Sequence, residues 1–173
     1  MIDLLGYGAF FLSTALVFAI ITLGLNLQWG LTGLFNVGIA GFVAIGAYTS
    51  AILTTPDAPD RIGGFGWPIL AGWLAAMALT AAAAAFTGFA TLRLKSDYLA
   101  ITTFGVAVVV QLAALNAVGL TGGPFGVAFI PRPFAGLQSD PLAFNLVNLC
   151  VIAAVTLAWY LALERLSRSP WGR

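Results

Sequence analysis

The sequence predicts an all-α integral membrane protein with about five transmembrane helices and a Gly/Asn-rich break between the first two. Of its 173 residues, 61% are hydrophobic and 8% are charged, and the mean hydropathy is +1.01. A soluble domain carries roughly 25% charged residues. The few charges stand in clusters that are separated by long uncharged stretches. We therefore expect residues 1–173 to form a single membrane domain.

The uncharged stretches define the expected helices. The first stretch, residues 4–56, is far longer than the roughly 20 apolar residues that one spanning helix needs, so it predicts two helices. Three later stretches, each bounded by charges, predict one helix apiece. The expected helices are about 4–27, 34–55, 68–92, 98–118 and 141–163.

Local signals mark where the later helices begin. Pro68 is expected as the first residue of the third helix, where its missing N–H is not needed. Ser96 or Asp97 is expected to cap the fourth helix, whose first N–H groups need acceptors. Asp140, directly before Pro141, is expected to cap the fifth helix in the same way.

The break within the first stretch carries the polar residues from which we predict a solute pathway. Asn26, Gln28, Asn36 and Gly38 lie in NLQWGLTGLFNVG, a segment rich in amides and glycine. Unwound backbone at membrane depth is tolerated where it faces a cavity or buried protein. One interpretation is a turn that reaches into the protein and lines a pathway. The other is a tight turn at the membrane surface, whose glycines only let helices pack closely. The sequence leaves both open.

Two further amides, Gln111 and Asn116, lie on the fourth expected helix and complete the predicted pathway. Neutral amides both donate and accept hydrogen bonds, which suits a zwitterionic or amide solute. Interhelical hydrogen bonding is the alternative role. The five-residue spacing turns the two side chains about 140° apart, so they need not share a face.

Lys and Arg predict the orientation, because cytoplasmic loops carry an excess of them. The turn 93–97 has two and the C-terminal tail has three, whereas the loops 56–67 and 119–140 have one each. The turn and the tail are therefore expected in the cytoplasm and the two loops outside. The predicted cytoplasmic-surface residues are Arg93, Lys95, Arg165, Arg168 and Arg173.

The composition argues against several classes of function. No Asp, Glu, Lys, Arg or His falls inside the five expected helices, which argues against a proton-coupled transporter and leaves an enzyme without an evident general base. The chain has no histidine and one cysteine, Cys150, so we expect no metal site. A net charge of +1 gives no electrostatic case for nucleic-acid binding.

Three stretches together resemble one family. They are GLNLQWGLTGLFNVGIAGFVAIGAYTSAIL (24–53), LRLKSDYLAITTFG (92–105), and LTGGPFGV followed by IPRPF (120–134). In this order the chain resembles the inner-membrane permease subunits of branched-chain amino-acid ABC importers, of the LivM-like kind. Position 39 is Ile, where relatives often carry a histidine, so any role of that side chain is absent here.

The resemblance implies a multi-pass permease subunit in the inner membrane that is not an enzyme. It implies a second related permease, two cytoplasmic ATPase subunits and an external solute-binding protein as partners. ATP would be hydrolysed by those partners, and this chain has no GxxxxGK[ST] phosphate loop. Because the family continues with a coupling loop and further helices, the chain is expected to correspond to the N-terminal half of such a permease.

We therefore expect the chain to form part of a translocation pathway for branched-chain amino acids. A related ABC permease for urea or short amides is one alternative, since nothing in the sequence measures the size of the solute site. A membrane scaffold that only packs against a partner and lipid is the other.

Overall fold

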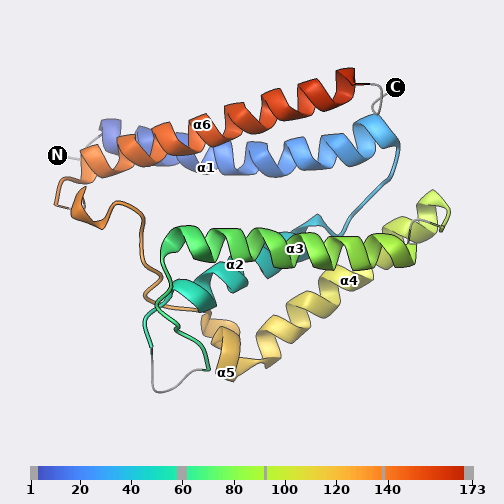
Figure 1. Cartoon of the computed structure of the whole chain (residues 1–173), viewed down its shortest axis with the longest axis horizontal. Helices are drawn as coiled ribbons and strands as arrows, with labels where there is room; N and C mark the ends of the chain where they lie inside the picture. Colours follow the sequence, from blue (N-terminus) through green and yellow to red (C-terminus); the bar gives the residue numbers. More distant parts are fainter. Residues whose placement is uncertain (1–3, 58–61, 92, 138, 170–173) are drawn as a thin grey trace. The chain divides into compact units, whose positions relative to one another are not determined.

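The computed structural model describes residues 4–57, 62–91, 93–137 and 139–169, and this part of the chain is helical without a strand (Figure 1). In chain order its elements are α1 (Leu4–Leu25), the π-helical turn η1 (Asn26–Leu31), α2 (Ile39–Thr54), α3 (Ile69–Thr91), α4 (Ser96–Asn116), α5 (Val118–Thr121), the 3-10 turns η2 (Gly123–Phe125) and η3 (Ala135–Leu137), and α6 (Pro141–Arg168). The all-α class is confirmed.

Four helical segments are long and apolar enough to cross a membrane: Leu4–Leu31, Ile69–Thr91, Asp97–Asn116 and Pro141–Arg168. The second expected helix, 34–55, is observed as α2, which is apolar but has only 16 residues. At about 1.5 Å per residue it reaches roughly 24 Å, short of the roughly 30 Å hydrocarbon core. The class of integral membrane protein therefore holds, while the count of five spanning helices stays a prediction.

The chain divides into two compact units, Met1–Leu34 with Phe134–Arg173, and Phe35–Pro133. We describe each unit by itself, and the expected single membrane domain stays a prediction. In the first unit α1 packs along α6, and the Asn145 side chain of α6 donates a hydrogen bond from Nδ2 to the carbonyl oxygen of Gly6 at 3.2 Å. Many large apolar side chains of α1, such as Phe10 and Phe18, are exposed, as lipid-facing side chains would be.

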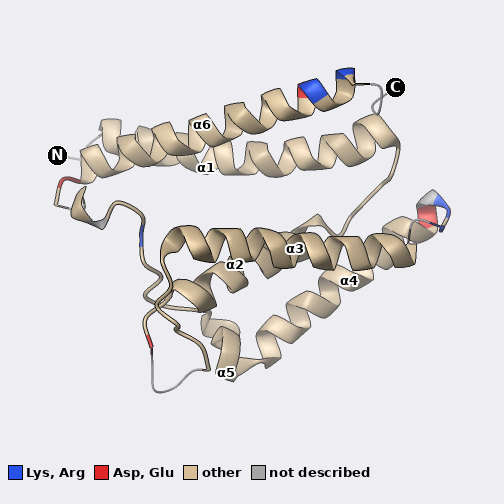
Figure 2. Ribbon diagram, in the orientation of Figure 1, with Lys and Arg blue, Asp and Glu red and all other residues tan. Residues whose placement is uncertain are grey.

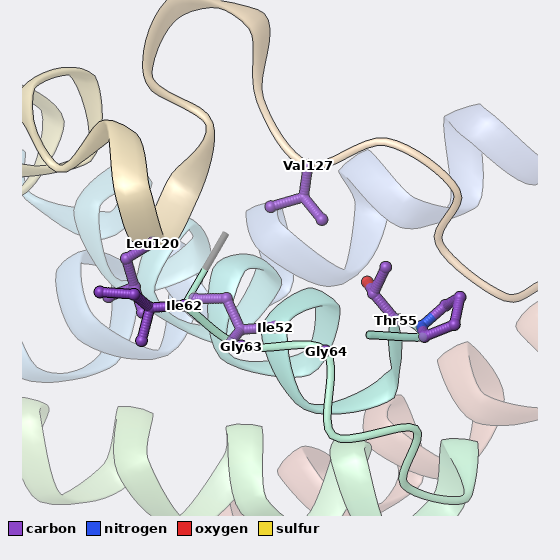
Figure 3. A pocket seen from close by; sticks show the side chains of 8 residues that line it. Ile52, Thr55, Ile62, Gly63, Gly64, Leu120 and Val127 are labelled. Atoms are coloured by element: carbon purple, nitrogen blue, oxygen red, sulfur yellow. The ribbon is translucent and has the colours of Figure 1, made fainter. Parts of the chain in front are cut away.

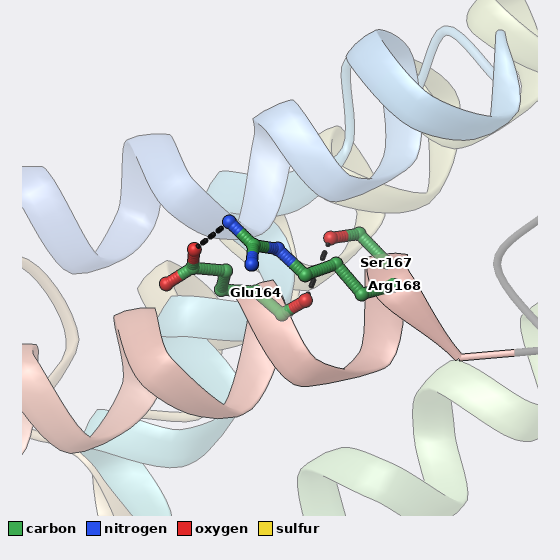
Figure 4. A network of polar contacts seen from close by, with 3 residues as sticks. All are labelled: Glu164, Ser167 and Arg168. Carbon is green, nitrogen blue, oxygen red and sulfur yellow. Dashed lines mark hydrogen bonds and ion pairs between the residues drawn. The ribbon is translucent and has the colours of Figure 1, made fainter.

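The boundaries of α6 show why a charged tail can remain helical. As predicted, Asp140 caps the helix, since its Oδ1 accepts from the N–H of Leu142 at 3.1 Å and of Ala143 at 3.3 Å. The helix continues five residues beyond the expected end at residue 163. Arg168 pairs with Glu164 at 2.6 Å one turn earlier (Figure 4). The helix stops at Ser169, because the residue before Pro170 is pushed out of helical geometry.

In the second unit α2 packs against both α3 and α4, and glycines permit the close approach. A Cβ atom on Gly41 would lie 2.9 Å from the Cα atom of Ala107 on α4, and one on Gly46 would lie 3.1 Å from Oγ1 of Thr80 on α3. Small residues at a crossing let two backbones come together where packing, rather than water, drives helix association. The glycines of α2 therefore have a packing role on two faces.

Two loops meet at one end of the second unit. Ile62 donates from its N–H to the carbonyl oxygen of Gly119 at 2.6 Å. Figure 3 shows Ile52, Ile62, Leu120 and Val127 around the small cavity beside this contact, which holds about 10 Å³. A space of about one water molecule with an apolar lining is a packing gap and not a ligand site. The loops 56–67 and 119–140 were expected on a common side of the membrane, and this contact between them agrees with that.

Two of the predicted start signals were wrong in detail, and the second expected helix begins at Ile39 instead of residue 34. Pro68 precedes α3 instead of opening it, because its carbonyl oxygen accepts the first helical hydrogen bond, from Gly72 at 3.1 Å. The fourth helix begins at Ser96 with Lys95 as its N-cap, so Ser96 and Asp97 lie in its first turn and not at the cap. An acidic residue there still favours the positive end of the helix dipole.

The fourth helix also ends at Asn116, two residues earlier than expected, and the short α5 follows. The buried Thr121 holds this bend, because its hydroxyl lies 2.5 Å from the carbonyl oxygen of Ala114 and 2.9 Å from that of Ala117. Gly122 follows with a φ of +76°, a conformation that glycine adopts without a steric penalty. The chain therefore turns out of α4 here.

The crossing of α2 and α4 can be tested by adding one methyl group. We expect Gly41→Ala to lower the free energy of unfolding by about 1–3 kcal/mol, because the new Cβ meets the Ala107 backbone, which cannot move aside cheaply. Thermal unfolding in detergent, followed by circular dichroism, measures this change.

Gly105→Ala on α4 is the matched control. No atom lies within 4 Å of its added Cβ, so the gain in helix propensity should stabilise the protein by about 0.5–1 kcal/mol. Equal effects of the two substitutions would contradict the close crossing.

Candidate solute pathway at the break after the first helix

The first half of the break is a π-helical turn in the first unit. Helical structure continues four residues past the expected end at residue 27, as η1. The carbonyl oxygen of Gln28 accepts from the N–H of Leu34 at 3.0 Å and from the hydroxyl of Thr32. Single π-helical turns appear frequently at functional sites, because they offset backbone groups from the regular helical ladder.

The two predicted pathway residues of this turn differ in their surroundings. Asn26 is exposed, and Gln28 is half-buried. The side-chain oxygen Oε1 of Gln28 is buried and has no hydrogen-bond partner in the described part of the chain. A buried acceptor without a partner costs free energy unless a donor reaches it. Gln28 can therefore accept a hydrogen bond from a group outside this unit or from a solute.

The second half of the break, in the second unit, is held by side chains in place of a helical ladder. Oδ1 of Asn36 accepts from the N–H of Gly38 at 2.7 Å. The N–H of Val37 donates to the hydroxyl of Thr103 on α4 at 3.2 Å. The carbonyl oxygen of Gly38 accepts from the N–H of Gly41, at 3.0 Å, as α2 begins. These bonds satisfy backbone groups that would be costly to leave unpaired at membrane depth.

The position of Gly38 along α4 shows how deep the break lies. Gly38 is buried, and a Cβ on it would overlap the carbonyl group of Thr103. Thr103 is seven residues after the start of α4 and thirteen before its end. At about 1.5 Å per residue, the contact lies roughly 10 Å from one end of the helix and roughly 20 Å from the other. The break therefore packs against the body of α4 and not against either of its ends.

The sequence did not single out Thr103 as a site residue, although its role is specific. Threonine hydroxyls in helices commonly bond backward to their own helix, and Thr103 does so, donating to the carbonyl oxygen of Ala100 at 3.1 Å. The same oxygen accepts from Val37, and the residue is only 3% exposed. Only the packing of α2 against α4 shows this second bond.

The two amides of α4 have different environments. Gln111 is exposed and lines a groove of about 560 Å³ between α2 and α4, together with Val37 and Tyr48. Asn116 lies at the end of α4, outside this lining, and donates from Nδ2 to the carbonyl oxygen of Leu112 at 2.7 Å. In the second unit, the structure therefore brings Gln111 near the break through Val37 and leaves Asn116 bonded to its own helix.

The predicted cytoplasmic cations lie at helix ends (Figure 2). Arg93 and Lys95 are exposed in the tight turn between α3 and α4. Arg165 and Arg168 are exposed in the last turn of α6, where positive charge also suits the helix dipole. Arg173 lies outside the described residues. Within the described residues no group of three His, Cys, Asp or Glu side chains could hold a metal ion.

The hydroxyl of Thr103 can be tested with an isosteric change. We expect Thr103→Val to lower the free energy of unfolding by about 1–3 kcal/mol, because it leaves the N–H of Val37 without an acceptor. Hydrogen exchange measured by mass spectrometry should become faster at Val37. Thr102→Val, at the exposed neighbouring position, is the control and should change neither quantity. Unchanged exchange at Val37 in Thr103→Val would show that the bond does not hold the break.

Comparison with known proteins places the chain in a family. Residues 8–173 match the family model described as branched-chain amino acid transport system / permease component. The chain is 37% identical to the high-affinity branched-chain amino acid transport system permease protein LivM of Escherichia coli, and 36% identical to the protein of the same name in Salmonella typhimurium. Each match covers 91% of this chain and 40% of the relative.

A more distant relative is the probable branched-chain amino acid transport permease protein LivM of Methanocaldococcus jannaschii. It is 25% identical over 91% of this chain and 52% of the relative. The chain thus spans about half or less of the length of these relatives. No solved structure matches the chain. Because the family model covers nearly the whole chain, the protein belongs to the branched-chain amino acid transport system permease family.

Proposed function

We propose that this chain forms part of the translocation pathway of an ABC importer for branched-chain amino acids. The observation that carries the proposal is the hydrogen-bonded break at Asn36–Gly38, in a chain that belongs to this permease family. The break packs against α4 roughly 10 Å along the helix from its start. Backbone of this kind at membrane depth is tolerated where it lines a cavity or is buried in protein. The family membership favours this function over a urea permease or a scaffold.

The energy for transport would come from other chains. The membrane-spanning helices, as far as the structure describes them, have their charged side chains at their ends, as Asp97 and Arg165 show (Figure 2). Proton-driven transporters generally use an ionisable group within the membrane. In this proposal two cytoplasmic ATPase subunits hydrolyse ATP, a second related permease completes the pathway, and an external binding protein delivers the solute. The subunit lies in the inner membrane with its C-terminal tail in the cytoplasm.

The pathway residues would act through neutral hydrogen-bonding groups. Amide side chains are present at Asn26, Gln28, Asn36 and Gln111. Gly38 lies two residues after Asn36, and Asn116 lies on the same helix as Gln111. An amide can donate to a carboxylate and accept from an ammonium group, so it serves a zwitterion without a permanent charge in the membrane. Gln28 supports this role, because its buried oxygen has no partner among the described residues.

The pathway assignment can be tested in a complete transporter that contains this chain. We expect Asn36→Leu combined with Gln111→Leu to lower the rate of leucine uptake by about tenfold, because each lost hydrogen bond is worth about 0.5–1.5 kcal/mol. Uptake of radiolabelled leucine by intact cells measures this rate.

Asn148→Leu on α6 is the matched control, because its amide bonds backward within the helix, to the carbonyl oxygen of Phe144 at 3.1 Å. Asn36→Ser, which keeps an acceptor for Gly38, separates the two roles of Asn36. Normal uptake by the double variant, with normal assembly, would remove these residues from the pathway.

A further inference from the structure

The groove between α2 and α4 has room for a small solute. Its volume is about 560 Å³, within the range of roughly 300–1,000 Å³ that is common for ligand sites. The space exists because small residues line it where the helices face each other, among them Ala40, Gly41, Ala44 and Ala107. Larger side chains at these positions would fill the groove.

The groove is continuous with the break. Val37, whose N–H is held by Thr103, lies at one end of the lining, and Leu115 of α4 lies at the other. The twelve-residue separation of Thr103 and Leu115 corresponds to roughly 18 Å along α4. The groove therefore runs from the unwound segment toward the end of α4 where the helix bends.

Two polar side chains interrupt an otherwise apolar lining. Tyr48 projects from α2 and Gln111 from α4, and the other lining residues, including Phe104 and Val108, are apolar. Within the described residues the side chains of Tyr48 and Gln111 are not paired with another protein group. Gln111 lies fifteen residues into α4, roughly 22 Å from its start and inside the segment long and apolar enough to cross a membrane. An amide facing lipid chains without a partner would be costly.

We propose that this groove binds the aliphatic side chain of the transported amino acid, with Tyr48 and Gln111 as the polar groups that position its charged end. This inference rests on the proposed function and adds both a location and a residue, Tyr48. The hydroxyl and the amide can each donate and accept, so they serve the carboxylate and the ammonium group of one solute. The apolar wall of Val37, Phe104 and Val108 takes the branched side chain.

The lining also predicts which solutes should not bind in the groove. No charged residue lines the groove, so a lysine or glutamate side chain would lose its hydration without an ion-pair partner. Discrimination among aliphatic side chains should be weaker, at about 10- to 200-fold per methylene, because an apolar pocket gains little from one carbon atom. Leucine, isoleucine and valine should therefore compete with one another, and lysine should not.

Cysteine labelling tests the groove without relying on transport. The background is Cys150→Ala, which removes the exposed native thiol. Ala40→Cys and Val108→Cys place thiols in the groove from opposite helices, and Ala82→Cys places one on an exposed position of α3 outside it. A charged maleimide is added to permeabilised membranes that hold the whole transporter. We expect both groove thiols to react at least tenfold faster than the thiol at position 82. Leucine should slow both reactions, and lysine should not.

The outcomes separate this inference from the proposed function. Groove thiols as unreactive as the one at position 82 would show that hydrocarbon or another helix covers the groove, which overturns the inference. Reactive thiols that leucine does not protect would show a hydrated groove without solute, which also overturns it. In both cases normal leucine uptake would leave the proposed function standing. Absence of leucine uptake by the unmodified transporter would instead overturn the proposed function.

Tyr48→Phe tests the hydroxyl alone, with Tyr7→Phe on α1 as the matched control. We expect Tyr48→Phe to raise the KM for leucine about three- to tenfold with assembly unchanged, because one hydrogen bond to the solute is lost. Tyr7→Phe should leave KM unchanged. An unchanged KM in Tyr48→Phe would remove the hydroxyl from the site.

Discussion

The second unit depends on the close crossing of α2 and α4. Gly38 and Gly41 bring the backbone of α2 against Thr103 and Ala107, and no side chain larger than hydrogen fits at either glycine without a shift. Once the backbones are this close, the hydroxyl of Thr103 can take the N–H of Val37. One crossing therefore both packs the helices and supplies the hydrogen bond that lets the chain stay unwound beside α4.

The same crossing leaves space beyond it. Glycines bring α2 and α4 into contact near the break. Farther along, the facing residues include the small Ala44 and Ala114, and they leave the groove between the two helices unfilled. Small residues thus give close packing at one point and a groove farther along. Polar groups occur in this groove, at Tyr48 and Gln111, whereas the threonines buried in α2 and α3, such as Thr54 and Thr91, bond to their own helices.

Hydrogen-bond accounting separates the candidate pathway residues. Asn36 and Asn116 are engaged with backbone groups nearby, at Gly38 and Leu112, and so part of their role is structural. Gln28 has a buried acceptor without a partner in the described chain, and the exposed side chain of Gln111 lines the groove. A free amide is the group that a passing zwitterion can use. In the proposed pathway, Gln28 and Gln111 therefore meet the solute more directly than the two asparagines.

The sequence by itself determined the helical membrane class, because few charges and long apolar runs permit little else in lipid. It also determined the Asp140 cap and the family, whose motifs are local. It could not determine the π-helical turn, the short α2 or the bend at Thr121, since these depend on hydrogen bonds between particular atoms. The second bond of Thr103 and the groove beside Gln111 were decided only by tertiary structure. Both features require contact between segments that are far apart in the sequence. Val37 and Thr103 are 66 residues apart, and no local pattern specifies that contact.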